Sequence, residues 1–245
     1  VMNMTGATKN PKVELSASLA NGSYNGIDID QGFVLATMQD HVINVQRIQG
    51  AKGDYKLSVY GRIPLAALYT TGYLDANDSK AMDMTVDFNE AGMAVIPLVT
   101  DTVQDATGAL KGVVHITGTL DQPQAYGTVS VRNGTMKIKS LGNDIKNIDG
   151  DLIFSGQQGD FQSRISMGKG SAGLAAKINW TGHTMTSYRM AAQLEGLNIA
   201  NEYVDGPLNG ELYIAEKDGI PTLMGNLNLE NIKFKIPLAL ESSES

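Results

Sequence analysis

Apolar and polar residues alternate with a period of two along most of this 245-residue chain. In one such run Val13, Leu15, Ala17 and Leu19 are separated by polar residues. Similar runs cover residues 55–60, 82–88, 171–180 and 223–236. Alternation of this kind predicts strands with one buried face and one solvated face, about fifteen of them here. The chain is therefore expected to be all-β.

A longer pattern repeats on top of the alternation. Gly-x4-Pro-x9-Asn-Gly occurs at residues 6–22 and again at 118–134, and a weaker third copy runs from Glu216 through Pro221 to Asn231. Matched offsets of this kind indicate structural repeats. We interpret each copy as adding strands to one continuous inner face. The Asn-Gly pairs at 21–22, 133–134 and 209–210 predict hairpin turns.

Two segments predict short helices, because each has a proline near its first position and a glycine just beyond its end. They are residues 63–72 and 97–106. Pro64 and Pro97 are expected to end strands, since proline cannot donate to a ladder. The helix at 97–106 is expected at the mouth of an apolar groove, as a linker or a removable plug. The repeats divide one elongated domain into segments 1–72, 73–182 and 183–245.

An apolar sheet face must be buried, and two short helices cannot cover fifteen strands. Two closures remain open: a β-sandwich, or an elongated sheet that curls around an internal groove. The chain contains 11 Met but only five Phe and one Trp, and small residues recur at inward positions. Methionine suits an adaptable apolar surface, which favours the groove.

The residues expected to line this groove occupy inward positions of the alternating runs. They are Val129, Val131, Met136, Ile138, Phe154, Phe161, Ile165, Met167, Leu174, Ile178, Trp180, Met190, Leu194, Leu212, Ile214, Leu227, Leu229 and Phe234.

No residue pattern predicts a reaction. The chain has no cysteine, which excludes thiolate catalysis, and its net charge of −7 argues against a nucleic-acid surface. The three histidines lack partners at metal-ligand spacing, and two aspartate pairs are interpreted as solvated strand faces. These residues are His41, His115 and His183, and Asp28 with Asp30 and Asp149 with Asp151. We expect no enzyme, no cofactor and no metal.

Residues 118–156, GTLDQPQAYGTVSVRNGTMKIKSLGNDIKNIDGDLIFSG, resemble the repeat of the TamB branch of the AsmA-like envelope proteins. That repeat has a G-x-L-x-x-P, a strand, a Gly-capped turn and an I-x-x-I-x-G-x-L-x-F-x-G strand. The last motif corresponds here to Ile145, Ile148, Gly150, Leu152, Phe154 and Gly156.

The resemblance implies a U-shaped antiparallel sheet, or β-taco, with an apolar groove between the inner and outer membranes of a bacterium. It implies phospholipid as the ligand, a periplasmic location, an inner-membrane anchor elsewhere in the full-length protein, and a barrel partner of the Omp85 class. This chain would be a fragment of such a protein.

Three functions follow as alternatives. The groove could shelter or conduct phospholipid acyl chains between the two membranes. The chain could instead be a periplasmic scaffold of the translocation and assembly module that assists outer-membrane protein insertion. The third alternative is a structural β-sandwich or adhesin-stalk segment.

Overall fold

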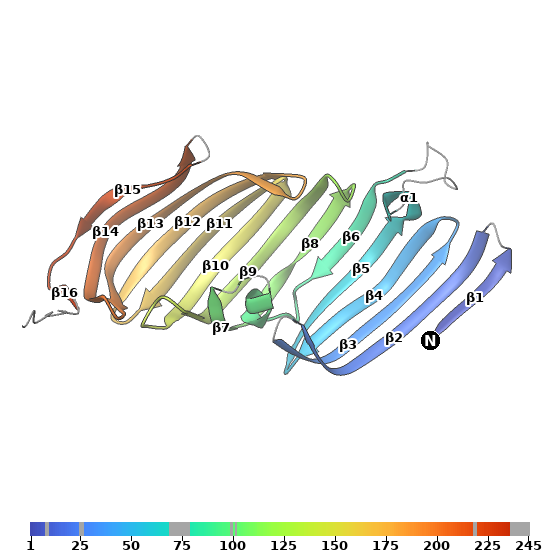
Figure 1. Cartoon of the computed structure of the whole chain (residues 1–245), viewed down its shortest axis with the longest axis horizontal. Helices are drawn as coiled ribbons and strands as arrows, with labels where there is room; N and C mark the ends of the chain where they lie inside the picture. Colours follow the sequence, from blue (N-terminus) through green and yellow to red (C-terminus); the bar gives the residue numbers. More distant parts are fainter. Residues whose placement is uncertain are drawn as a thin grey trace, which may run out of the picture.

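The computed structural model describes residues 1–7, 10–24, 27–68, 79–98, 100, 102–217 and 220–235. The expected all-β fold is confirmed: strands make up 78% of the chain and form one large antiparallel sheet, which is curled but not closed into a barrel. Figure 1 shows this sheet as an elongated row of strands, with β1 at one end and β15 at the other.

Sixteen strands and two short helices lie within the described residues. The strands are β1 (Met2–Ala7), β2 (Asn10–Tyr24), β3 (Ile27–Gln39), β4 (Val42–Lys52), β5 (Tyr55–Pro64), β6 (Met82–Asp87), β7 (Val103–Thr107), β8 (Leu110–Gly118), β9 (Pro123–Ile138), β10 (Ile145–Gly156), β11 (Gln158–Met167), β12 (Gly170–Thr181), β13 (Thr184–Ala200), β14 (Val204–Lys217), β15 (Ile220–Asn228) and β16 (Lys233–Phe234). The helices are α1 (Leu65–Leu68) and the 3-10 helix η1 (Met93–Leu98).

The strands follow one another in chain order from β1 to β15, except that β7 and β16 lie off this path. β7 pairs with the end of β9, and β16 pairs with β14. The sheet continues without a break across both segment boundaries, because β5 pairs with β6 and β12 pairs with β13. Each strand on this path therefore pairs with strands that are its neighbours, or near neighbours, along the chain.

The three copies of the repeat adopt the same local structure. In each copy the first residue is the cross-strand partner of the proline five positions later, and the asparagine ten positions after that proline has a left-handed backbone. The pairs are Gly6–Pro11, Gly118–Pro123 and Glu216–Pro221, and the asparagines Asn21, Asn133 and Asn231 have φ of 55°, 53° and 59°. The repeated unit is a hairpin, β1–β2, β8–β9 or β14–β15.

The hairpin turns predicted at the Asn-Gly pairs are wrong. All three pairs lie inside long strands: β2, β9 and β14. The left-handed Asn133 kinks β9 instead of ending it, and the register to β10 shifts on both sides of its neighbour Gly134. A left-handed asparagine serves a bulge as well as a turn, so the dipeptide alone does not distinguish them.

The helix predicted at 97–106 is also wrong. The helical turn is η1, which begins at Met93, and residues from Val103 onward form β7. Pro97 lies inside η1 rather than at the end of a strand. Val103 and Ala106 are buried because β7 pairs with the end of β9, so a tertiary pairing overrides the local helical signal.

The helix predicted at 63–72 is reduced to the four residues of α1, and residues 69–72 lie outside the described part of the chain. Pro64 is the last residue of β5, as predicted.

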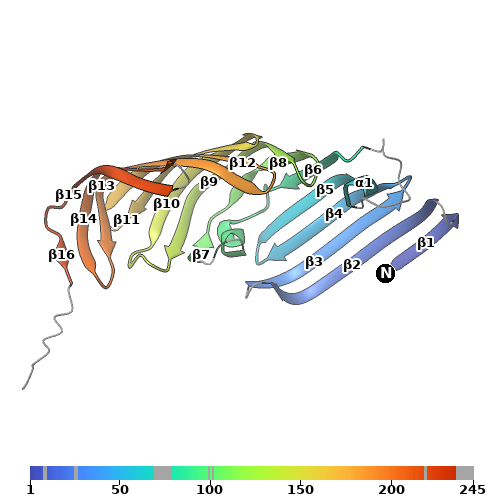
Figure 2. The same cartoon turned by 45° about the horizontal axis from the view of Figure 1, so that its top comes forward.

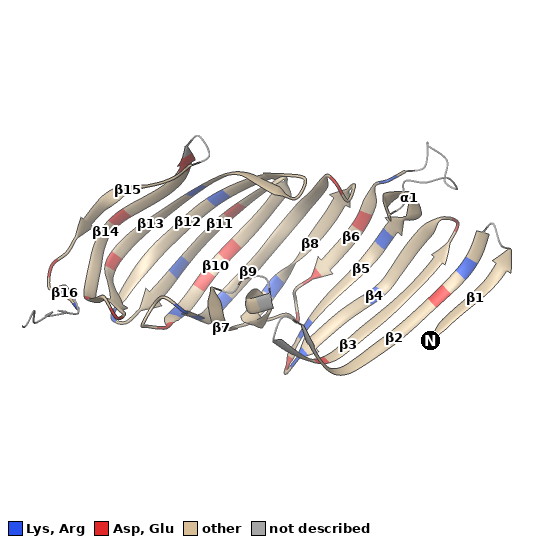
Figure 3. Cartoon of the chain, in the orientation of Figure 1, with Lys and Arg blue, Asp and Glu red and all other residues tan. Residues whose placement is uncertain are grey.

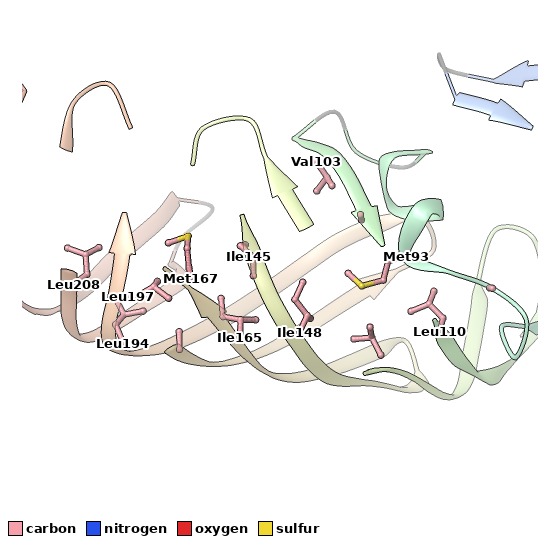
Figure 4. Close-up of a cluster of buried hydrophobic side chains, with 14 residues drawn as sticks. Met93, Val103, Leu110, Ile145, Ile148, Ile165, Met167, Leu194, Leu197 and Leu208 are labelled. Atoms are coloured by element: carbon pink, nitrogen blue, oxygen red, sulfur yellow. The ribbon is translucent and has the colours of Figure 1, made fainter. Parts of the chain in front are cut away.

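The main hydrophobic core lies on one face of the curled sheet, which we call the inner face. It brings together side chains from η1, from β7 and from β8–β14. Figure 4 shows Met93, Val103 and Leu110 on one side of this cluster and Leu194, Leu197 and Leu208 on the other, with Ile145 and Ile165 between them.

An elongated molecule is expected in solution. Fourteen strands on one path, spaced ~4.8 Å apart, give a sheet on the order of 60 Å long. A compact chain of this length would have a radius of gyration of ~18 Å. Small-angle scattering should give a clearly larger value and an asymmetric distance distribution. A value near ~18 Å would contradict this arrangement.

Candidate functional site

The inner face carries an unbroken apolar row that crosses the strands, because directly opposed residues in antiparallel strands share a face. From β2 to β13 the opposed residues are Ala17, Val34, Ile48, Val59, Val86, Val114, Gly127, Phe154, Gly159, Ile178 and Tyr188. We call these residues the central row. It contains no charged residue and runs across the strands, along the long axis of the sheet. Figure 2 shows the curl of this sheet in a view turned by 45° from that of Figure 1.

Nine of the predicted lining residues belong to the packed core or contact it. Val131, Ile165, Met167 and Leu194 are buried in the cluster. Val129, Met136, Ile138, Leu174 and Leu212 are partly buried against it. These side chains pack against one another and fill the space on this part of the inner face. We call this part the closed corner.

Another five lie half-buried on the strands outside this cluster: Phe154, Phe161, Ile178, Trp180 and Ile214. The rings of Phe154 and Trp180 meet edge to face, with centroids 6.3 Å apart. Phe154 and Ile178 belong to the central row, and Phe161 and Ile214 lie in the next row of the same face.

The remaining four are exposed toward the C-terminal end of the sheet. Met190 and Leu227 have exposed fractions of 47% and 41% on the inner face. Leu229 follows the end of β15, and Phe234 lies on the two-residue strand β16. The structure thus gathers the predicted residues into a packed corner, a half-buried row and an exposed end rather than one uniform channel.

A small apolar cavity of about 160 Å³ lies between η1 and the first half of the sheet. Ile48, Leu57 and Val59 of the sheet and Ala94 and Val95 of η1 contribute to its walls. None of these residues was among the predicted lining set. The alternation at 55–60 placed Leu57 and Val59 on one face, but no sequence signal placed η1 above them.

The opposite, outer face carries many of the charged residues. Figure 3 shows acidic and basic residues side by side on neighbouring strands. Examples are the ion pairs Arg62–Asp83 at 3.2 Å and Lys177–Asp160 at 3.3 Å. A hollow of about 590 Å³ lies mostly over this face and is walled by residues such as Arg164 and Glu211. Its charged walls do not suit an apolar ligand.

Asp151 is held in its charged form by two neighbours on β9. Its carboxylate accepts hydrogen bonds from the Ser130 hydroxyl at 2.6 Å and from the Arg132 guanidinium at 2.8 Å. The hydroxyl contributes most, and the guanidinium next, to lowering the pKa of Asp151. The neighbouring Asp149 accepts from the N–H of Asn133 at 2.9 Å. This aspartate pair therefore ties the outer face of β9 to β10.

A small, pH-dependent loss of stability is expected for Asp151→Asn. Since the folded pKa is lowered, the carboxylate stabilises the fold above its unfolded pKa of ~3.9, and this is lost as the pH falls through the folded pKa. The pair is partly exposed, so the loss at pH 7 should stay below ~1 kcal/mol. Urea unfolding should show the difference from the native chain shrinking below about pH 4. Asp54→Asn is the control, and an equal pH dependence there would contradict this assignment.

No group of three His, Asp or Glu side chains that could hold a metal ion exists among the described residues. His115 lies on the outer face, with its Nδ1 3.1 Å from the Thr85 hydroxyl. The part of the chain that the structure describes also contains no helix long and apolar enough to cross a membrane.

Comparison with known family models, with curated proteins and with solved structures finds no match to this chain.

Proposed function

We propose that the inner face shelters or conducts phospholipid acyl chains between the inner and outer membranes of a bacterial envelope. The observation that carries this proposal is the central row, an uncharged apolar path along the long axis of an open sheet. An acyl chain laid along it would meet apolar side chains on successive strands, and the aliphatic surface of the chain requires no specific polar partner.

Exposure of the inner face supports a ligand rather than a purely structural role. Its apolar residues are exposed toward both ends of the sheet: Met2, Met4, Leu15, Leu19, Ile48, Met190, Leu223 and Leu227 are each at least 39% exposed. Monomeric proteins rarely leave large contiguous apolar patches in water, and those that do use them for binding. Burial of these side chains against hydrocarbon would stabilise the complex by roughly 25 cal/mol per Å² of apolar surface covered.

The substitution Ile178→Asp tests this proposal. It places an unpaired carboxylate in the central row, which costs several kcal/mol against an acyl chain. Lipid retained by protein purified from a double-membraned bacterium, measured by extraction and mass spectrometry, should fall more than ~10-fold.

Ile153→Asp is the matched control, because Ile153 is 47% exposed and lies directly opposite Asp160 on the outer face. It should retain lipid as the native chain does. Absence of lipid from the native chain, or equal retention by the two variants at equal folded content, would contradict the proposal.

A further inference from the structure

The apolar cavity between η1 and the sheet has a roof that is fixed in place. The Met93 N–H donates to the Gly108 carbonyl at 2.8 Å, and the Leu110 N–H donates to the Ala91 carbonyl at 2.8 Å. The Met93 side chain is only 2% exposed and belongs to the main hydrophobic core. Backbone and side-chain contacts thus hold η1 above the sheet, so the cavity exists before any ligand enters it.

The floor of the cavity lacks a side chain because β4 has a glycine there. Gly50 lies on the inner face, opposite Leu57 and two residues from Ile48. A Cβ built on Gly50 would meet no atom within 4 Å. A glycine inside a strand weakens the strand and often marks a place where a ligand approaches the backbone closely. The absent side chain at Gly50 therefore contributes to the empty volume.

The walls of the cavity suit hydrocarbon. Apart from Lys52, Tyr55 and Lys56, the lining residues are apolar or glycine. Both lysines are exposed, so their charged ends lie in water rather than in the cavity. Apolar cavities of ~150 Å³ stay dry and bind benzene or xenon, and the volume here is about 160 Å³. The space therefore matches about six carbon atoms of a hydrocarbon.

One end of the cavity is closed. There the ring of Tyr55 lies against Gly92, where a Cβ would come within 2.5 Å of the ring. Next to this contact the Lys56 N–H donates to the Glu90 carbonyl at 2.6 Å, and the Lys56 ammonium lies 3.5 Å from the Glu90 carboxylate. These contacts join the segment before η1 to the start of β5, so a ligand does not pass through this end.

The other end of the cavity meets the central row. Ile48 and Val59 line the cavity, and they are also members of that row. Ile48 is 39% exposed, which leaves this end accessible from the inner face. The cavity is therefore a blind side pocket of the central row.

We propose that this side pocket binds the methyl end of a single acyl chain whose remaining length lies on the central row. The inference rests on the proposed function and adds to it a fixed end point for the chain. The methyl end enters first, because a carboxylate or headgroup would lose its hydration in a blind apolar pocket. Burial of the chain end under η1 then fixes where along the row the acyl chain lies.

Nuclear magnetic resonance of the whole, delipidated chain with added palmitate tests this inference. Palmitate that is isotope-labelled at its methyl carbon should show nuclear Overhauser contacts to the methyl groups of Leu57 and Val95. Palmitate labelled at the carbon next to its carboxylate should show no contact to these two residues. Methylene groups farther along the chain should contact other members of the central row.

Gly50→Leu places a side chain in the side pocket, where a Cβ has free space. The palmitate methyl group should lose its contacts to Leu57 and Val95, and the affinity for palmitate should fall at least ~10-fold because apolar burial is lost. Gly173→Leu is the matched control, because a Cβ there also meets nothing within 4 Å but lies on the outer face, opposite Arg164. It should bind palmitate as the native chain does.

Three results would overturn the inference and leave the proposed function standing. They are palmitate contacts to the central row alone, contacts of the carboxyl end of palmitate to Leu57 and Val95, and unchanged palmitate affinity in folded Gly50→Leu. A native chain that binds no palmitate would contradict the proposed function together with this inference. The contacts in the native chain decide the matter even where Gly50→Leu does not fold.

Discussion

Met167→Ala is expected to lower the free energy of unfolding by about 2–4 kcal/mol, the cost of removing a large buried side chain whose surroundings relax only in part. Met167 is only 2% exposed, and it lies in the cluster that joins η1 and β7 to β8–β14. This cluster joins segments that lie far apart in the sequence, so the cavity should destabilise the whole corner. Urea unfolding followed by circular dichroism measures the change.

Met190→Ala is the matched control for this substitution. Met190 lies on the same face of the sheet but is 47% exposed, so its truncation should cost less than ~1 kcal/mol. Similar losses for the two variants would show that the corner is not packed as described. A loss confined to Met167→Ala would locate the stability of the fold in the closed corner.

Gly142→Val is expected to open one side of the closed corner and to lower the free energy of unfolding by about 2 kcal/mol or more. The new Cβ would clash with backbone atoms, and no change of side-chain rotamer can relieve such a clash. Gly142 lies in the loop between β9 and β10, and a Cβ there would overlap the backbone oxygen of Ala200. Next to it, the Asn143 amide donates to the Asn198 carbonyl at 2.8 Å. This loop reaches β13 past the two intervening strands β11 and β12.

Hydrogen exchange provides the second readout for Gly142→Val. The amides of residues 196–200 should lose protection, while those of the central strands, such as residues 126–131, keep theirs. Gly173→Ala is the control, because a Cβ at Gly173 meets nothing within 4 Å. Unchanged exchange at 196–200 in Gly142→Val would show that the loop does not hold this end of β13.

Much of the strand pattern could be predicted because alternation is a local property. Each strand pairs with its neighbours along the chain, and directly opposed residues of paired strands lie on the same face of the sheet. The face assigned to the residues of one strand therefore also fixes the face of the residues opposite them. Within β9 the predicted inward positions change from odd numbers (129 and 131) to even numbers (136 and 138). In the structure all four side chains lie in the core or pack against it. The cause is the left-handed Asn133 within a continuous strand, rather than the predicted turn.

The candidate site was predictable as a face but not as a shape. Val131 and Met190 belong to the same alternating pattern, yet the first is 9% exposed and the second 47%. The difference depends on whether another segment lies over the strand. Such a contact joins residues far apart in sequence, as Met93 does when it meets Gly134, and no periodicity encodes it.

By itself, the sequence determined that this chain forms antiparallel strands with one apolar face, and that its hairpins repeat with the same proline and asparagine positions. These features depend on side-chain period and backbone preference, which act over a few residues. Only the tertiary structure decided where the sheet curls, that residues 103–107 join it as β7, and that η1 covers a cavity on its inner face. Each of these outcomes results from competition between local preference and the burial of apolar area by distant segments, and here burial prevailed.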